Sequence, residues 1–407
     1  MSSTVDERTA WWERADLAHR SGRLHFCGRD VAELAAAHGT PSFLYSFPRI
    51  ESKIQSLLDA AQEYGLLHRF RILYAMKANR FAALLTALGI SEQVGIDACS
   101  PNEVEHAISC GFRPSDVSLT AHSLSPSDFL RLCRMPALHI NFDSTSAIHS
   151  WGTLRPGSEI GIRINPGCGV NRANNETLSY CGERTTKFGI YREQFDEALE
   201  VAQTHDLRVT TIHFHTGCGY LDDQLPALDR VLQSARWFIN RVPTLEAINI
   251  GGGLGVPHVR SEKPLDLHAW AALIVKHFGS DRLRIQIEPG EFLVKDAGIL
   301  LATVCYAETK RDQNFVGLNV GFNIAPEPVC YGLPFEPVPV VDNAQAEFIS
   351  ATIAGNINEA MDVWCESVDV RRQEVGDTLA LLNAGAYSAA MASNHCMRGD
   401  FKEFLLR

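Results

Sequence analysis

Eight short apolar runs alternate with amphipathic helical stretches between residues 41 and 294, and this alternation constrains the fold more than any other feature. The apolar runs are residues 70–75, 95–98, 117–120, 139–142, 160–165, 209–215, 247–250 and 284–288. The helical stretches include residues 50–64, 101–110, 125–132, 191–203 and 225–242. Eight strands that alternate with helices predict a (β/α)8 barrel of the TIM type, an α/β fold.

The pattern of apolar and polar residues changes after residue 295. Residues 299–307, 314–320, 347–354 and 378–382 have the composition of strands, and no long helical pattern separates them. We therefore predict a barrel domain over residues 41–294 and a second, mainly β domain formed by residues 1–40 and 295–407. A chain of 407 residues with 45% apolar residues is large enough for two cores.

Bulk properties exclude several classes of protein. A net charge of −11 argues against nucleic acid or an anionic membrane surface as the partner. No apolar run approaches the length of a membrane span, and the polar start of the chain does not resemble a signal peptide. The 11 cysteines are scattered without a CxxC pair, which predicts reduced thiols in a cytoplasmic protein and no metal site.

Two motifs indicate the chemistry. The segment Tyr74-Ala75-Met76-Lys77-Ala78-Asn79 delivers a lysine from an apolar strand end, where desolvation should free the amine for Schiff-base formation. The glycines Gly251, Gly252 and Gly253 follow another strand, and their backbone N–H groups can surround an anion. A Schiff-base lysine together with a phosphate cradle suggests pyridoxal 5'-phosphate.

Further residues support that cofactor. Glu288 ends an apolar strand, and a carboxylate at that position can keep a pyridine nitrogen protonated. His213 and His215 project from one face of a strand, because side chains alternate with a period of two. We interpret His213 as a hydrogen-bonded strand histidine and His215 as a ring that stacks on the cofactor. Tyr387 offers a phenol for the phosphate.

The chain resembles the fold-type III, pyridoxal-phosphate-dependent amino-acid decarboxylases, and within them the diaminopimelate decarboxylases. The resemblance runs from about residue 40 to the C-terminus. Its motifs are Tyr74 to Asn79, Asp97 with Ser100 and Glu103, Arg163-Ile164-Asn165, Lys187-Phe188-Gly189, His215-Thr216-Gly217, Gly251-Gly252-Gly253, Glu288-Pro289-Gly290 and Gly385-Ala386-Tyr387.

This resemblance implies a role for each matching residue. Lys77 should carry the cofactor, Glu288 should hold the pyridinium nitrogen, and His215 should stack on the ring. The phosphate should be bound by Gly251, Gly252, Gly253, Gly290 and Tyr387, with Asp97 and Arg163 near the lysine and ring. Cys218 stands where the family usually has serine, so that phosphate contact should be weakened or lost.

The family's catalytic cysteine lies in a Gly-Pro-x-Cys-Glu-Ser-x-Asp segment, and two stretches compete for this position. Cys365 is followed by a glutamate and a serine, as in the family. The stretch 355–362 carries the glycine, glutamate and aspartate at the family's spacing and lies at a better distance from Gly385. We therefore expect Asn358 at the catalytic position and Glu359 as the neighbouring acid, with Cys365 as the alternative.

The second departure concerns the substrate. Diaminopimelate decarboxylases hold the distal carboxylate of their substrate with two arginines, whereas this chain has Glu291 and Glu327, the latter in a segment ending at Tyr331. Two glutamates would repel a carboxylate by several kcal/mol at an effective dielectric constant of about 20. We expect these residues to bind a distal ammonium group. In the alternative, both glutamates are solvated or are paired with Lys295 or Arg398.

The sequence thus predicts a pyridoxal-phosphate-dependent decarboxylase for a basic amino acid without a distal carboxylate. D-lysine or D-ornithine fits best by resemblance, and the products would be a diamine and carbon dioxide. The resemblance also implies a homodimer with shared active sites. The alternatives are decarboxylation of meso-diaminopimelate or of a pathway-specific diamino acid, an amino-acid racemase, and a cofactor-free regulatory homologue.

Overall fold

The chain folds into two compact units in a computed structural model that describes residues 10–172, 178, 180–182, 184–215 and 217–407. The barrel unit consists of Lys53–Val256 and Lys263–Leu293. The β unit consists of Met1–Ser52, Pro257–Glu262 and Val294–Arg407. Thr216 of the His215-Thr216-Gly217 motif lies outside the described residues, as does the start of the chain.

The barrel unit contains a closed barrel of eight parallel strands, in the spatial order β11-β13-β14-β5-β6-β7-β8-β9. These strands are β5 (Phe70–Ala75), β6 (Val94–Ala98), β7 (Val117–Thr120), β8 (His139–Phe142), β9 (Glu159–Arg163), β11 (Arg208–His213), β13 (Ala247–Asn249) and β14 (Arg284–Ile287). The predicted (β/α)8 barrel is therefore confirmed, strand by strand.

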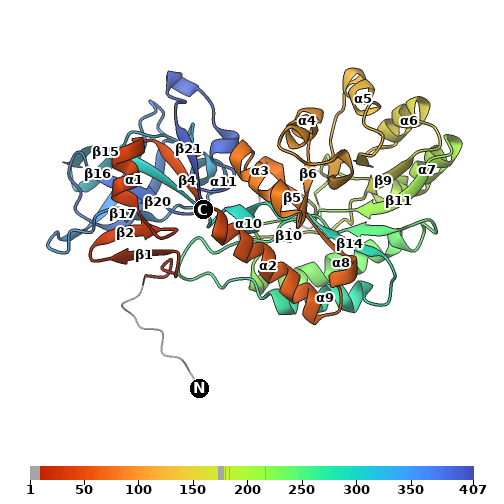
Figure 1. The fold of residues 1–407 in the computed structure, drawn as a ribbon, viewed down its shortest axis with the longest axis horizontal. Coiled ribbons are helices and arrows are strands. Elements are labelled where there is room, and N and C mark those ends of the chain that lie inside the picture. The colour runs from red at the N-terminus through yellow and green to blue at the C-terminus, as the bar shows by residue number, and fades with distance from the viewer. Residues whose placement is uncertain (1–9, 173–177, 179, 183, 216) are drawn as a thin grey trace. The chain divides into compact units, whose positions relative to one another are not determined.

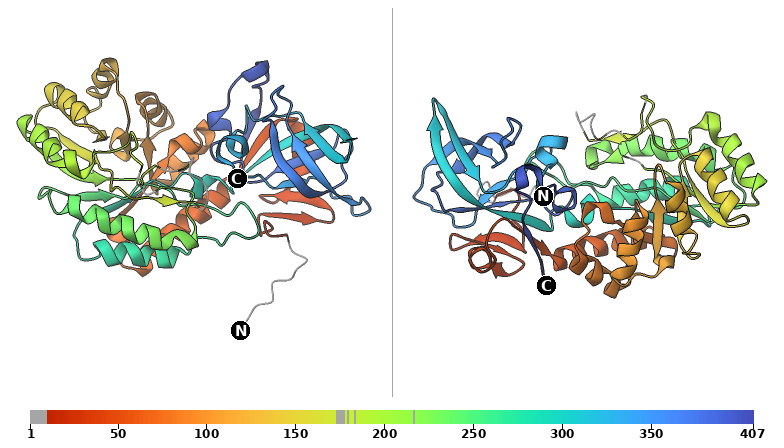
Figure 2. Two further views of the ribbon diagram at one scale, coloured as in Figure 1. Left: turned by 180° about the vertical axis from the view of Figure 1, so that it is seen from behind. Right: turned by 90° about the horizontal axis from the view of Figure 1, so that it is seen from above.

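Helices alternate with these strands and lie outside them (Figures 1 and 2). They are α2 (Phe47–Glu63), α3 (Ala82–Ser91), α4 (Pro101–Ser109), α5 (Pro126–Leu132), α6 (Thr145–Leu154), α7 (Arg192–Thr204), α8 (Leu225–Ile239), α9 (Leu267–Phe278) and the single turn α10 (Glu291–Val294). Helix α8 buries Leu228, Leu232 and Ala235, whose spacing places them on one face. Within the described part of the chain, no helix has both the length and the apolar character needed to cross a membrane.

The start of α4 explains the spacing of Ser100 and Glu103. The Ser100 hydroxyl accepts a hydrogen bond from the Glu103 backbone N–H at 3.2 Å, and the Glu103 carboxylate accepts one from the Cys99 N–H at 2.6 Å. The first bond satisfies an N–H group that a helix leaves unpaired at its first turn, and the second ties the residue before the N-cap to the helix. The motif therefore fixes the loop that directly follows β6.

The interior of the barrel contains a hydrogen-bonded polar layer. Asn141 is fully buried and donates to the hydroxyl groups of Ser118 at 3.1 Å and Thr120 at 2.9 Å. Gly161 on the neighbouring strand β9 makes room for this amide, because a Cβ at residue 161 would overlap the Asn141 Oδ1 atom. Directional bonds thus hold together a layer that aliphatic side chains commonly fill in such barrels.

The β unit is built around a mixed sheet with the strand order β17-β20-β15-β16-β18-β19, while β4 pairs with both β15 and β21. The strands of this sheet are β4 (Ser42–Ser46), β15 (Gly298–Lys310), β16 (Gln313–Leu318), β17 (Pro337–Pro339), β18 (Phe348–Ala354), β19 (Val363–Arg371), β20 (Thr378–Leu381) and β21 (Lys402–Leu406). A three-stranded sheet of β1 (Leu17–Arg20), β2 (Arg23–Phe26) and β3 (Arg29–Asp30), helix α1 (Val31–His38) and the short helix α11 (Glu327–Tyr331) complete the unit. The predicted mainly β second domain is confirmed as a fold class.

Strand β4 lies on the other side of the predicted domain boundary at residue 41. All of its residues are buried, and it runs between β15 and β21 in the sheet of the β unit. A strand with neighbours on both edges and both faces covered belongs to a sheet core. Residues 42–46 therefore belong to the β unit in the structure, although the sequence pattern placed them with the barrel.

Candidate active site

Lys77 lies immediately beyond the carboxyl end of β5, in the single turn Met76–Ala78. The Tyr74 hydroxyl donates to the Asn79 carbonyl at 2.8 Å, and the Asn79 side chain accepts from the Phe81 N–H at 2.9 Å. These bonds fix the turn that carries the lysine. The Ala75 N–H also donates to the Pro289 carbonyl at 3.2 Å, which ties this strand end to the Glu288-Pro289-Gly290 turn on the adjacent strand.

The expectation that burial alone would free the Lys77 amine was wrong. The pKa of Lys77 is raised, first by Cys99 and then by Asp97, Tyr180 and Glu288, and these contributions outweigh desolvation. Acidic groups stabilise a nearby ammonium only when they are themselves ionised, and the Cys99 thiol reaches that form only at high pH. A free amine at Lys77 therefore requires the proton to move to another group of the site.

Glu288 is bonded through both of its carboxylate oxygens. His213 Nε2 lies 3.0 Å from Oε2, and the Asn249 amide donates to Oε1 at 2.7 Å. Burial favours the protonated acid, but His213, Lys77 and Asn249 together lower the pKa of Glu288. The carboxylate thus stays ionised in a buried position, as a partner for a pyridinium nitrogen must. His213 is the hydrogen-bonded strand histidine that we predicted, whereas Asn249 was missed.

Asp97 and Cys99 follow one another on the same face at the end of β6. Asp97 is 2% exposed, and its Oδ1 atom has no hydrogen-bond partner among the described residues. Its pKa is raised by burial and then by Glu288. Burial also raises the pKa of the Cys99 thiol to about 12, so the thiol is uncharged at neutral pH. Cys99 was missed, although its period-two spacing from Asp97 was visible in the sequence.

His215 is a neutral ring at the end of the loop after β11. Burial, followed by Lys77 and Arg163, holds the pKa of His215 well below its usual range. The ring packs edge-on against Tyr180 with centroids 4.9 Å apart, and Nδ1 accepts from the Gly252 N–H at 3.4 Å. The Arg163 guanidinium lies over the Phe188 ring, 4.8 Å from its centroid. Tyr180 is a further neighbour of the site that the sequence did not reveal.

The backbone of the triple glycine packs directly against the backbone of neighbouring loops. Gly251 has φ +69° and Gly253 has φ +98°, conformations that L side chains rarely adopt. A Cβ at Gly252 would overlap the Glu288 carbonyl, and one at Gly253 would overlap the Gly217 carbonyl. Only glycine allows these loops to meet. The Gly251 N–H donates to the Asn249 side chain at 2.9 Å, and the Gly252 N–H donates to His215, so binding of an anion by these glycines stays a prediction. Gly290 follows in the adjacent turn and accepts from the Leu293 N–H at 3.2 Å.

Cys218 lies on the short strand β12 (Gly217–Cys218), which pairs in parallel with β10 (Val170–Asn171). This pairing places Cys218 in the loop that approaches Gly253. Its thiol contributes to the raised pKa of Tyr180, after burial of that phenol. The expected weak phosphate contact of Cys218 stays a prediction.

Glu291 forms a buried ion pair with Arg172. The Nη1–Oε1 distance is 3.4 Å, and the side chains are 5% and 4% exposed. Arg172 also donates to the carbonyls of Gly219 at 3.2 Å and Val256 at 3.0 Å, and the Val256 N–H donates to Glu291 at 3.4 Å. The sequence reasoning missed Arg172 as the partner of Glu291. The charge at this position is neutralised within the chain.

Glu327 is also paired, in the β unit. It begins α11 and forms an ion pair with Lys295, and the two side chains are 1% and 0% exposed. Lys295 also donates to the Ala386 carbonyl at 3.5 Å. Pairing with Lys295 was the alternative to a role of Glu327 in substrate binding. Binding of a substrate ammonium group by Glu327 therefore stays a prediction. Tyr331 ends the same helix and is partly buried.

The β unit also carries Tyr387 and the two competing catalytic stretches. Tyr387 adopts φ +52° in the loop after β20 and is partly buried. Asn358 and Glu359 are exposed in the connection between β18 and β19, where Glu359 lies 3.4 Å from His395. Cys365 instead lies within β19, where its thiol donates to the Phe335 carbonyl at 3.3 Å and burial raises its pKa to about 12. The assignment of Asn358 rather than Cys365 to the catalytic position stays a prediction.

The barrel residues fit the cofactor that the sequence suggests. An ionised Glu288, a glycine cradle that a Cβ would fill, and an unpaired Asp97 oxygen surround the end of the Lys77 strand. Pyridoxal phosphate supplies an electron sink when it is bound. Lys77 can hold its aldehyde carbon, Glu288 its ring nitrogen and the glycines its phosphate.

Comparison with known proteins agrees with this geometry. Residues 49–295 match the family model described as pyridoxal-dependent decarboxylase, pyridoxal binding domain. The diaminopimelate decarboxylase of Methanothermobacter thermautotrophicus is 32% identical over 95% of this chain and 91% of its own length. That of Streptomyces coelicolor is 30% identical over 93% of this chain and 87% of its own length.

A solved structure shares the whole architecture. The diaminopimelate decarboxylase of Helicobacter pylori in complex with L-lysine superimposes with a TM-score of 0.84 at 25% identity, covering 93% of this chain and 94% of that one. The family match and the full-length relatives concern the same strands that carry Lys77, Glu288 and the triple glycine. This chain belongs to the family of pyridoxal-phosphate-dependent amino-acid decarboxylases.

Proposed function

We propose that this enzyme decarboxylates a basic amino acid that lacks a distal carboxylate, with D-lysine or D-ornithine as the first candidates. The products would be carbon dioxide and a diamine. The relatives are diaminopimelate decarboxylases, which supports a basic amino acid as the substrate. The preference for the D configuration follows from the family resemblance.

The neutral ion pairs at Glu291 and Glu327 carry this proposal. Both residues stand where the resembled family uses arginine to hold the distal carboxylate of its substrate. In this chain each position holds a buried glutamate that is paired with a cation of the chain, Arg172 or Lys295. Arg172 is also occupied by two backbone carbonyls. The distal carboxylate of a substrate would therefore find no free cation at these two positions. A basic amino acid without a distal carboxylate does not need one.

The barrel residues would share the chemical work as follows. Lys77 binds the cofactor, and the ionised Glu288 keeps the ring nitrogen protonated, which makes the ring an effective electron sink. His215 is neutral and packs edge-on against Tyr180, so it adds no charge near the cofactor ring. Asp97, whose pKa is raised, can hold a proton next to Lys77.

A substrate panel tests the proposal directly. Released carbon dioxide would be measured with D- and L-lysine, D- and L-ornithine, D-arginine and meso-diaminopimelate, with the Lys77→Ala variant as the blank. We expect kcat/KM for D-lysine or D-ornithine to exceed that for meso-diaminopimelate at least tenfold. A preference for meso-diaminopimelate would instead mean that this enzyme shares the activity of its relatives. It would also refute the argument from the paired glutamates Glu291 and Glu327.

We further propose that the enzyme is a homodimer whose active sites combine residues of both subunits. Asn358 and Glu359 are exposed on the connection between β18 and β19, so they are accessible to a second copy of the chain. Heterodimers of Lys77→Ala and Glu359→Ala chains would then contain one intact site. Activity should return to roughly a quarter to a half of the parent's after mixing. Inactive heterodimers of proven composition would contradict shared sites.

A further inference from the structure

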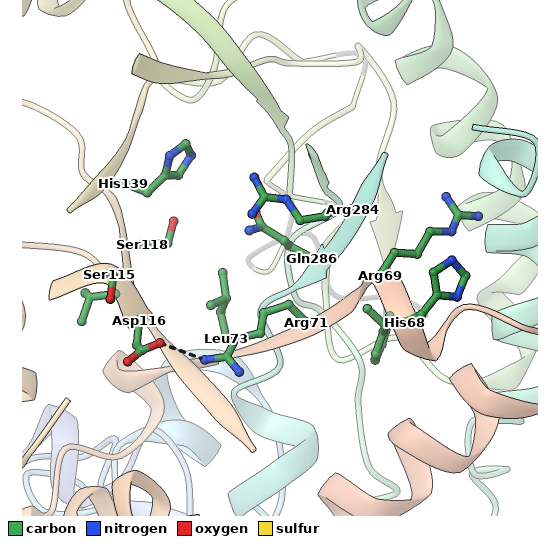
Figure 3. A pocket seen from close by; sticks show the side chains of 12 residues that line it. His68, Arg69, Arg71, Leu73, Ser115, Asp116, Ser118, His139, Arg284 and Gln286 are labelled. Carbon is green, nitrogen blue, oxygen red and sulfur yellow. Dashed lines mark hydrogen bonds and ion pairs between the residues drawn. The ribbon is translucent and has the colours of Figure 1, made fainter. Parts of the chain in front are cut away.

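A polar pocket opens at the amino ends of the barrel strands, opposite the ends that carry Lys77 and Glu288. We call it the basal pocket. It has a volume of about 290 Å³ and is lined by His68, Arg69, Phe70, Arg71, Leu73, Ser115, Asp116, Val117, Ser118, His139, Arg284 and Gln286. Figure 3 shows Arg284 and Gln286 on one side of this space and Ser118 and His139 on the other.

The strand register explains why these side chains converge. Arg71 on β5 is the direct neighbour of Gln286 on β14, and Ser118 on β7 is the direct neighbour of His139 on β8. Between these two pairs, Gly95 on β6 has no side chain. A Cβ at residue 95 would overlap the Asp116 carbonyl and come within 3.3 Å of the Arg71 Nη2 atom. The Leu73 side chain would also lie 2.8 Å from that Cβ, so Gly95 leaves space for the Asp116 backbone and Leu73 first, and for the Arg71 guanidinium at its edge.

The basal pocket is positively charged on a chain whose net charge is −11. Arg69, Arg71 and Arg284 line it, and Asp116 alone among the described lining residues carries a carboxylate. Asp116 is shared, because its oxygens lie 2.7 Å from Arg113 and 3.4 Å from Arg71. Asp116 therefore neutralises Arg71 only partly.

The other two arginines have different roles. Arg69 donates to the carbonyls of Asp281 and Leu283 at 2.7 and 2.9 Å, so it is fixed at the rim and has no carboxylate partner in those bonds. Arg284 lies 3.2 Å from Glu246, which is bound more closely by Arg208 at 2.6 Å. Arg208 is also paired with Glu159, so Arg208 and Arg284 share two glutamates. Arg284 makes the longer contact to Glu246 and is 61% exposed, so its guanidinium can turn toward a ligand in the pocket.

A neutral acceptor in the pocket also lacks a partner. The Oε1 atom of Gln286 is buried and has no hydrogen-bond partner among the described residues. An amide can present either its oxygen or its N–H₂ group after a rotation of its plane. A ligand oxygen can accept from the Gln286 N–H₂ group when that group faces the pocket, and from the neighbouring guanidinium groups.

We propose that the basal pocket binds a small dianionic oxyanion through the guanidinium groups of Arg71 and Arg284 and the amide of Gln286. Guanidinium groups bind carboxylates and phosphates through paired N–H donors, so both chemical classes fit. The pocket volume suits an anion of the size of phosphate or malonate. This site is separate from the triple glycine, which follows the carboxyl end of β13 at the opposite end of the barrel.

Binding to the cofactor-loaded enzyme tests the proposal, because the cofactor then fills the phosphate cradle at the catalytic end. Equilibrium dialysis with labelled inorganic phosphate and calorimetry with malonate would measure the two anion classes at constant ionic strength, set with chloride. We expect one additional anion per chain. If only phosphate binds, the natural ligand of the basal pocket carries a phosphoryl group. If only malonate binds, the natural ligand is a carboxylate.

Variants locate the site. Arg71→Gln and Arg284→Gln should each weaken anion binding at least tenfold, while cofactor absorbance and decarboxylation stay at the parent's values. Arg284 is 61% exposed, so its replacement leaves the barrel intact even if Arg71→Gln impairs folding. Arg131→Gln is the matched control, because Arg131 and Arg71 are both 35% exposed and each is paired with one acid within 3.5 Å.

Two results would overturn the proposal. The first is that the loaded enzyme binds neither phosphate nor malonate at millimolar concentrations. The second is that the Arg284→Gln variant binds them as tightly as the Arg131→Gln control does.

Discussion

His213 Nε2 lies 3.0 Å from Glu288 Oε2, and both side chains are almost completely buried. The pair joins β11 to the end of β14, the two strands that flank β13, and Asn249 of β13 donates to the second carboxylate oxygen. Three strands therefore hold one carboxylate in a fixed orientation. A pyridinium nitrogen would meet an ionised partner whose position does not depend on the cofactor.

Replacing His213 with glutamine should raise the pKa of Glu288, because His213 contributes most to lowering it against burial. Glu288 would then be protonated at pH values where the parent carboxylate is ionised. The acid limb of the kcat/KM profile should move upward by about one pH unit, which corresponds to roughly 1.4 kcal/mol. The profile is measured by carbon dioxide release from pH 4 to 9. An unchanged acid limb would show that Glu288 ionisation does not control activity.

Lys77→Ala should abolish decarboxylation and the visible absorption of the cofactor-loaded protein. Lys77 is the lysine at the carboxyl end of β5, next to Asp97 and Glu288. The control is Lys276→Ala, which removes an exposed lysine that is paired with Asp229 on the outside of the barrel. Absorption spectra after addition of pyridoxal phosphate provide the readout. If Lys77→Ala retained the parent spectrum, the cofactor would be attached elsewhere.

Arg172→Gln should destabilise the folded protein by about 3–5 kcal/mol, because it leaves the Glu291 carboxylate buried without its cation. The double variant Arg172→Gln, Glu291→Gln should recover most of that loss, since no buried charge remains. Denaturant unfolding of the loaded enzyme measures both values. Equal destabilisation in the single and double variants would show that an unpaired Glu291 carboxylate is not the cause of the loss.

The same variants separate a structural role of Glu291 from substrate binding. If Glu291 also holds the ammonium group of a substrate, the stable double variant should show a KM for D-lysine raised at least tenfold. If KM is unchanged in that folded protein, Glu291 has only a structural role, as the partner of Arg172.

His139 should make the protein less stable as the pH falls from 6.5 to 4. Burial lowers the pKa of His139 to about 4, supported by Arg284 and His213 and opposed by Asn141 and Glu159. Below pH 6.5 the unfolded chain binds a proton that the folded chain does not bind, so the free energy of unfolding decreases. The loss reaches about 3 kcal/mol at pH 4. Unfolding curves of His139→Gln should show a correspondingly smaller decrease over this range.

The barrel could be predicted from the sequence because its strands are short apolar runs at regular intervals. The strand-end residues followed from the same pattern, since parallel barrels present their sites at the carboxyl ends of strands. Lys77, His215, the glycines and Glu288 could be placed at strand ends in this way, whereas Asp97 followed from the family resemblance. Strand β4 did not, because a fully buried strand shows no alternation that indicates which sheet it joins.

The errors at individual residues have a common physical origin. The protonation of Lys77 depends on Cys99 and Asp97, which come from the neighbouring strand β6. The pairing of Glu291 depends on Arg172, which is far from it in the sequence. Electrostatic neighbours are set by tertiary packing, and a linear pattern of residue types does not contain that information.

The buried amide of Asn141 also bears on how this barrel can change by mutation. An aliphatic core accepts many combinations of side chains of similar total volume. A layer built on bonds from Asn141 to Ser118 and Thr120 requires a donor and acceptors in fixed directions, and Gly161 must stay without a side chain. We expect the middle of this barrel to tolerate fewer substitutions than the helices around it, so new substrate preferences should arise through the loops at the strand ends.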